Sequence, residues 1–127
     1  MSTPTSIVNR AYEAFAAGDI PTVIGLLAPD VEWVSPRTLP HGGDYHGRAG
    51  ATEFFTNLGH AWETLTLRVD HVSDLDDGQV IGVAQATGRL RTGTTTGYAV
   101  THLFAVRDGE ITSFHEFTDL DGPIVAS

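Results

Sequence analysis

Two residues near the C-terminal end of the chain, His102 and Glu116, have side chains suited to acid–base chemistry. Side chains alternate across a strand, so His102 shares one face of its segment with Phe104, and Glu116 shares one face of the next segment with Phe114. A His and a carboxylate that face one apolar interior from neighbouring strands can exchange protons with a bound molecule. We therefore expect both residues to be catalytic.

A hairpin over residues 98–119 would position this pair. The turn Arg107-Asp108-Gly109-Glu110 separates two alternating apolar segments, and Asp-Gly in that setting is a strong hairpin signal. On the second strand, strict alternation predicts that Ile111 and Ser113 share the face opposite to Glu116.

Each residue of the pair also has a structural interpretation. A His on an apolar strand face is more often a hydrogen-bonded core residue than a catalyst, and Glu116 could simply pair with His102 or Arg48. Burial would raise the pKa of the Glu116 carboxyl, whereas a charged His would lower it. That competition decides which of the two is the acid and which is the base.

Composition narrows the class of protein. A length of 127 residues fits one domain over 1–127, and the net charge of −9 argues against nucleic acid or an anionic membrane as partner. Cysteine is absent, which leaves no disulfide and no thiolate metal site. The N-terminal sequence MSTPTS has no apolar leader pattern, so we expect a cytoplasmic protein.

Helical patterns occupy the N-terminal half. Residues 6–17 have apolar positions at helical spacing, with Thr5 or Ser6 as the cap and Gly18 as the stop. Asp19 is expected to cap a second helix that ends at Pro29-Asp30. A strand over 31–35 follows, and it ends at Pro36.

The middle of the chain combines a loop with a third helix. Residues 37–50 are rich in Gly, Pro and His and have no periodicity, which predicts a long loop of the kind that often forms a lid. A helix is expected from about Arg48 to Gly59, followed by antiparallel strands that include 65–72 and 80–90. Helices gathered on one side of a curved antiparallel sheet give an α+β half-barrel with a pocket on its concave face.

Three segments carry a resemblance to a known family. They are AYEAFAAGDIPTVIGLLAPDVEW, LPHGGDYHGRAGATEFF and THLFAVRDGEITSFHEFTD. The chain resembles the nuclear-transport-factor-2-like superfamily, and within it the SnoaL-like proteins, named after a polyketide cyclase. The resemblance implies a cone-shaped half-barrel: a curved, mainly antiparallel sheet with three helices packed on its concave side. It places His102 at the cyclase's active-site His and Glu116 at its acid/base Asp.

The steroid isomerase branch of the superfamily fits less well. Its general base is an Asp before the Pro that ends the first strand, where this chain has Ser35. In that branch a Tyr on the first helix donates a hydrogen bond to the oxyanion, and its position corresponds to Ala11 here, with Tyr12 one residue away. We expect Tyr12 to assist catalysis if its hydroxyl points inward.

The remaining site candidates are expected to line the pocket or its rim. They are Trp33, Ser35, His41, Tyr45, Phe54, Trp62, Gln85, Phe104 and Phe114. The pattern His41-x2-Asp44-x-His46 could also suggest zinc, but its flexible glycines and the resemblance to metal-free relatives favour a lid. We expect no metal and no cofactor.

These observations predict an enzyme that removes a proton beside the carbonyl group of a small hydrophobic molecule and drives isomerisation, ring closure or elimination. Glu116 would be the base and His102 the donor to the enolate oxygen, although the two roles could be exchanged. The alternative is a non-catalytic binder of a hydrophobic ligand. His115 and Phe117 point away from Glu116, and in relatives that outer sheet face forms a dimer, so we expect a homodimer.

Overall fold

The computed structural model describes residues 3–120, so the two ends of the predicted 1–127 domain lie outside the described residues. Three helices and six strands make up the described part. In chain order they are α1 (Pro4–Ala16), α2 (Ile20–Gly25), β1 (Leu27–Ser35), β2 (Gly43–His46), α3 (Gly47–Ala61), β3 (Trp62–Asp74), β4 (Gln79–Leu90), β5 (Thr95–Arg107) and β6 (Glu110–Thr118).

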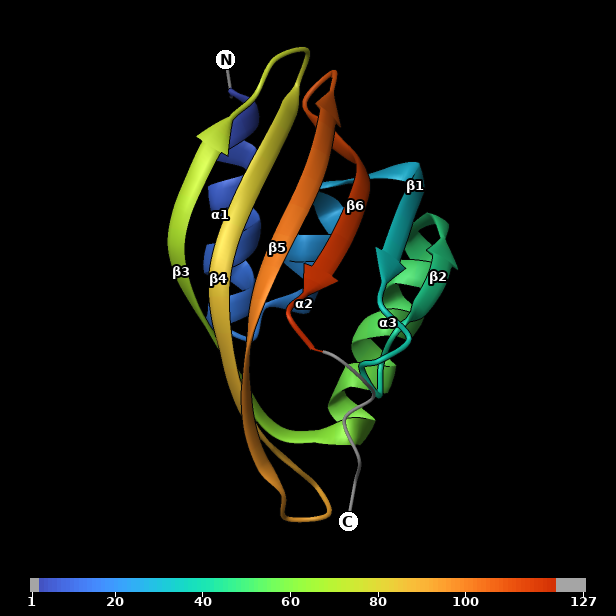
Figure 1. Cartoon of the computed structure of the whole chain (residues 1–127). Helices are drawn as coiled ribbons and strands as arrows, with labels where there is room; N and C mark the ends of the chain where they lie inside the picture. Colours follow the sequence, from blue (N-terminus) through green and yellow to red (C-terminus); the bar gives the residue numbers. More distant parts are fainter. Residues whose placement is uncertain (1–2, 121–127) are drawn as a thin grey trace.

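The strands form one curved sheet in the order β2-β1-β6-β5-β4-β3. All neighbours are antiparallel except β1 and β6, which run parallel, so the sheet is mixed. The three helices lie on the same side of the sheet, with α1 behind β3 and β4 and α3 beside β1 and β2 (Figure 1). The predicted α+β cone with three helices is confirmed.

The first two helices differ from the predicted ones at their ends. Thr3, rather than Thr5 or Ser6, caps α1, and its hydroxyl accepts from the Ser6 N–H. Asp19 caps α2 as expected, but that helix ends at Gly25, and Pro29 and Asp30 belong to β1. The strand begins at Leu27 because this residue already pairs with Ile111 of β6. The register shifts between Leu27 and Glu32, and a shift of this kind is where a strand can contain a proline such as Pro29.

The predicted long loop is shorter than expected. Gly43–His46 forms the edge strand β2 against β1, and α3 begins directly after it. The remaining turn is tight: a Cβ on Gly42 would lie 1.8 Å from the Pro36 carbonyl oxygen, so only glycine fits there. Gly59 lies inside α3 and does not close it. The segment is a packed corner of the sheet and not a lid.

The C-terminal hairpin has the predicted turn and an unpredicted bulge. Asp108 and Gly109 both have positive φ, at 53° and 80°, as the tight hairpin turn requires. Val106 pairs with Ile111 whereas Ala105 pairs with Ser113, so Thr112 is an extra residue on β6. The bulge turns Ile111 inward, where it is fully buried, so the prediction that Ile111 and Ser113 share a face is wrong.

Candidate active site

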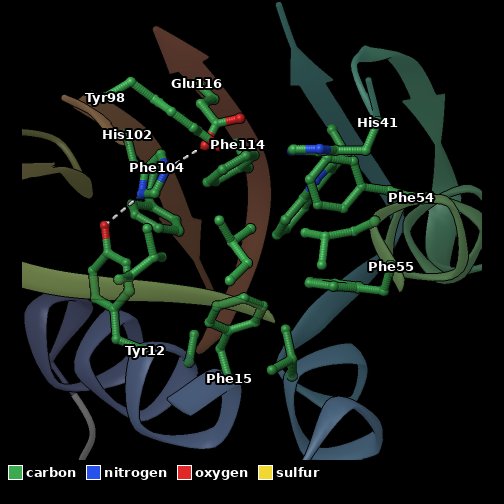
Figure 2. A pocket seen from close by; sticks show the side chains of 16 residues that line it. Tyr12, Phe15, His41, Phe54, Phe55, Tyr98, His102, Phe104, Phe114 and Glu116 are labelled. Carbon is green, nitrogen blue, oxygen red and sulfur yellow. Dashed lines mark hydrogen bonds and ion pairs between the residues drawn. The ribbon is translucent and has the colours of Figure 1, made fainter. Parts of the chain in front are cut away.

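A chain of four hydrogen-bonded side chains runs across the concave face. The Tyr12 hydroxyl lies 2.7 Å from Nδ1 of His102, and Nε2 of His102 lies 2.8 Å from Oε2 of Glu116. The other carboxylate oxygen, Oε1, accepts from the Ser35 hydroxyl at 2.6 Å. Figure 2 shows Tyr12 reaching up from the helix to His102, with Glu116 on the far side of the imidazole.

The sheet register brings these groups together. His102 and Glu116 are direct partners in the β5–β6 ladder, and both side chains face inward. Ser35 ends β1, which runs parallel to β6 and pairs Val34 with His115, so its hydroxyl reaches the carboxylate from the neighbouring strand. Of the two structural partners considered for Glu116, His102 pairs with it, whereas Arg48 bonds to Glu110 at 3.1 Å.

A glycine makes room for Tyr12. Gly82 on β4 faces His102 across the ladder, and a Cβ there would lie 2.1 Å from the Tyr12 hydroxyl oxygen. That position therefore has to lack a side chain for Tyr12 to reach His102.

Burial and hydrogen bonds together determine where the protons of this network lie. Burial raises the pKa of Glu116, but the bond and charge of His102 and the bond from Ser35 outweigh it, so the pKa lies below its ordinary value. Burial, and then the charge of Glu116, raise the pKa of Tyr12, which keeps its proton. An ionised Glu116 can only accept, so Nε2 of His102 donates to it, and in the neutral tautomer of His102 that this requires, Nδ1 accepts the Tyr12 O–H.

His41 and Trp62 form a second buried hydrogen-bonded pair, on the side of the concave face opposite to Glu116. Trp62 Nε1–H donates to Nδ1 of His41 at 3.0 Å, and both side chains are 2% exposed. Burial lowers the pKa of His41, and Glu116 partly opposes this by raising it. The Trp62 ring rests on Gly88 of β4, where a Cβ would lie 2.8 Å from the ring.

A mostly apolar pocket lies between these two walls (Figure 2), with about 570 Å³ of empty space that is partly open to solvent. Its lining comes from all three helices, the turn after β1 and four strands. The lining residues are Ala11, Tyr12, Phe15, Val23, Trp33, His41, Phe54, Phe55, Leu58, Leu65, Leu67, Tyr98, His102, Phe104, Phe114 and Glu116. A second space adjoins it between α1 and β3, and its lining includes Tyr12, Phe15, Leu65 and Leu67, which also line the first pocket.

Eight of the twelve predicted site residues line this pocket and four do not. Ser35 and Trp62 lie behind the lining and hold Glu116 and His41. Tyr45 packs on Phe54 and bonds to the His41 carbonyl oxygen. Gln85 alternates with the buried Ala84 and Ala86, so it faces the outer side of the sheet, and its predicted place in the pocket is wrong.

The three residues of the pattern His41-x2-Asp44-x-His46 differ in their burial. His41 is buried within the pocket wall and not on a rim, whereas Asp44 and His46 are exposed. Within residues 3–120, no cluster of three or more His, Asp or Glu side chains could hold a metal ion. Nor does that part of the chain contain a helix long and apolar enough to cross a membrane.

Sequence reasoning missed half of the lining. Tyr98 could have been found, since it lies two residues before Val100 in the same inward row as His102. Phe15 and Phe55, which pack together across the pocket, could be read only as core residues at helical spacing. Leu65 and Leu67 lie on the edge strand β3, and their alternation gave no sign of which neighbour they face.

A comparison with known families identifies the chain. The model of the SnoaL-like domain matches residues 8–114. The chain belongs to the SnoaL-like family. An uncharacterized protein of Mycobacterium tuberculosis is 30% identical over 112 residues, which cover 87% of this chain and 85% of that protein.

Solved structures support the SnoaL-like assignment. A nuclear-transport-factor-2-like protein of Burkholderia thailandensis is 33% identical, with a TM-score of 0.87, and the match covers 94% of this chain and 92% of that one. A putative polyketide cyclase of Xanthomonas campestris is 27% identical, with a TM-score of 0.79 over 89% and 87% of the chains. TerC co-crystallized with polyporic acid is 26% identical, with a TM-score of 0.82 over 92% of both chains.

Proposed function

We propose that this SnoaL-like protein is a cofactor-free acid–base enzyme that acts on a small hydrophobic carbonyl compound. The observation that carries the proposal is the placement of one carboxylate. Glu116, whose side chain is 9% exposed, lines an apolar aromatic pocket and is held there by His102 and Ser35. Buried carboxylates in apolar surroundings are costly unless they are paired or functional.

The proposed step is proton abstraction next to a carbonyl group. The α C–H bond breaks, its proton forms an O–H bond to Glu116, and the electron pair moves onto the carbonyl oxygen as an enolate. Return of the proton from Glu116 to another carbon would complete an isomerisation. Attack of the enolate carbon on a second carbonyl would close a ring, and the new alkoxide oxygen would take the proton from Glu116. Expulsion of a leaving group that takes the proton would complete an elimination. The low pKa of Glu116 keeps the base ionised at neutral pH.

Two kinds of relative are consistent with this chemistry. A putative polyketide cyclase has the same fold at 27% identity, and ring closure is one of the outcomes that the proposed step allows. TerC was co-crystallized with polyporic acid, which supports a small organic molecule as the occupant of such a pocket.

Deuterium exchange tests the step without knowledge of the natural substrate. Small hydrophobic ketones such as 1-indanone and 2-tetralone are incubated with the protein in D2O, and loss of the α-proton signal is followed by NMR. The wild type should accelerate exchange, and Glu116→Gln should reduce the rate by roughly a hundredfold or more, as expected for removal of a general base. Equal rates for Glu116→Gln and the wild type would refute the proposal.

A non-catalytic ligand-binding role is the second candidate, and one observation favours it. Tyr12, His102, Glu116 and Ser35 bond to one another, which is also what a purely structural network would do. Tight binding of the ketones with no acceleration of exchange by the wild type would favour this candidate.

A further inference from the structure

The two nitrogens of His41 have different environments. An indole N–H can only donate, so the Trp62 bond requires a lone pair on Nδ1 of His41. The proton of the neutral imidazole is therefore on Nε2. The tautomer follows from the partner and not from an assumption about pH.

The Nε2–H of His41 has no acceptor among residues 3–120, although the side chain is 2% exposed. His41 lines the pocket and reaches across it from the wall opposite Glu116 (Figure 2). This nitrogen is not among the fully enclosed polar atoms that lack a partner, so it opens to the pocket, where the apolar lining offers no acceptor and a bound molecule can supply one. Trp33, in the same wall, also has an indole N–H without a partner in the described part of the chain.

His102, by contrast, has no free nitrogen. Nδ1 faces the Tyr12 hydroxyl and Nε2 faces Glu116, so a direct bond from His102 to a substrate oxygen would break one of these contacts. The position of His102 suits the task of holding the carboxylate. The donor to a developing enolate oxygen must then come from another group.

We propose that neutral His41 supplies this donor: its Nε2–H binds the carbonyl oxygen of the substrate while Glu116 removes the adjacent α-proton. This assignment rests on the proposed function and defines the substrate class further. The substrate has an oxygen acceptor and an acidic C–H close enough together to contact both walls, and the rest of its surface is apolar.

The electrostatics of the pocket fit this role. Burial lowers the pKa of His41, so the ring is neutral near pH 7 and keeps its Nε2 proton as a donor. The carboxylate of Glu116 partly opposes this by raising the pKa of His41, so the two side chains lie within electrostatic range of each other. A donor aimed at the site of developing charge stabilises the enolate without rearrangement.

The first test reads the tautomer directly and needs no substrate. Long-range 1H–15N spectra of the labelled protein at pH 7 should show His41 as the neutral Nε2–H form. Trp62→Phe should increase the fraction of the Nδ1–H form, because the ring then has no donor at Nδ1. A charged His41, or the Nδ1–H form, in the wild type would overturn the assignment.

The second test measures donation to an oxyanion. Glu116→Gln imitates the charge state after proton transfer, and 4-nitrophenolate imitates the enolate, with binding followed by absorbance. Adding His41→Phe should weaken phenolate binding roughly ten- to a hundredfold, as for loss of a hydrogen bond to a charged group. His41→Gln should restore part of the loss, because its amide can accept from Trp62 and still donate. His60→Phe makes the same change at an exposed site and serves as the control.

The outcomes separate this inference from the proposed function. Unchanged phenolate binding in the His41→Phe variant refutes the role of His41, whatever the exchange assay shows. Full exchange activity in Glu116→Gln refutes the proposed function, while the tautomer and the phenolate affinity can still establish His41 as a pocket donor.

Discussion

At the scale of single residues, Ser35 determines part of the behaviour of Glu116. Its hydroxyl donates to Oε1 and helps to lower the pKa of the carboxyl, so Ser35→Ala should raise that pKa. Because the base must be ionised, the rate of α-proton exchange rises as the pH passes upward through this pKa. The rise should therefore occur at higher pH in Ser35→Ala, with Ser113→Ala as the control. A profile that coincides with that of the wild type would show that Ser35 does not act through Glu116.

The same carboxylate links stability to pH. The folded pKa of Glu116 lies below its ordinary value of 4.5, so ionised Glu116 stabilises the fold above that pH and the stabilisation is lost as the pH falls. The difference in unfolding free energy between the wild type and Glu116→Gln should therefore be largest above about pH 4.5 and shrink below it. Urea denaturation at a series of pH values measures it. A difference that grows on acidification would mean that burial outweighs the hydrogen bonds.

At the scale of elements, the inner row of β4 determines where the functional side chains lie. Gly82 gives space to Tyr12, which reaches His102, and Gly88 gives space to Trp62, which holds His41. The single strand therefore places one aromatic donor behind each histidine. A Cβ at Gly82 would first meet the Tyr12 hydroxyl, and a Cβ at Gly88 would meet both the Thr64 carbonyl oxygen and the Trp62 ring.

A double-mutant cycle tests this role of β4. Gly82→Ala should displace the Tyr12 hydroxyl and lower stability by about 1–3 kcal/mol, as overpacking does. In the Tyr12→Phe background the cost should be smaller, because the atom nearest to the new Cβ is the missing hydroxyl oxygen. Urea denaturation of the four proteins gives the coupling. Equal costs in both backgrounds would show that Gly82 does not act through Tyr12.

The helix α3 offers a simpler prediction. Gly59 lies inside the helix, and a Cβ there would meet nothing within 4 Å. Gly59→Ala should therefore stabilise the protein by about 0.5–1 kcal/mol, because alanine loses less backbone entropy on folding. Gly47→Ala should destabilise it, since that residue has φ at 72°. Thermal unfolding of both variants measures the signs, and a loss of stability in Gly59→Ala would contradict this account of the helix.

The elements also show what the sequence could and could not predict. The alternation of side chains along each strand was sufficient to predict the β5–β6 hairpin and to predict that His102 and Glu116 face the same side of the sheet. The bulge at Thr112 was not predictable, because it lies where β6 is also paired with β1, a contact between distant segments. The link from Trp62 to His41 was missed for the same reason: it joins the start of β3 to a turn that looked like flexible loop.

At the scale of the whole molecule, the outer face of the sheet is a candidate contact surface. Phe117 is 55% exposed there, next to Thr101 on β5 and on the face opposite to Glu116. A sheet face that carries an exposed aromatic can pack against a second copy and bury that side chain. We therefore predict a homodimer through this face, with the two concave pockets opening away from the contact.

Charge determines how such a dimer should respond to salt. Each copy has a net charge of −9, so association brings like charges together and they repel each other. Salt screens this repulsion and leaves the apolar contact intact. Dimerisation at micromolar concentration should therefore strengthen as salt is added, as measured by light scattering. Phe117→Asp should weaken it at least about tenfold, since burial of a phenylalanine contributes about 1.5–3 kcal/mol. Leu75→Asp, at an exposed site in the β3–β4 turn, is the matched control. A monomeric mass for the wild type at every salt concentration would contradict the prediction and leave Phe117 as an isolated surface residue.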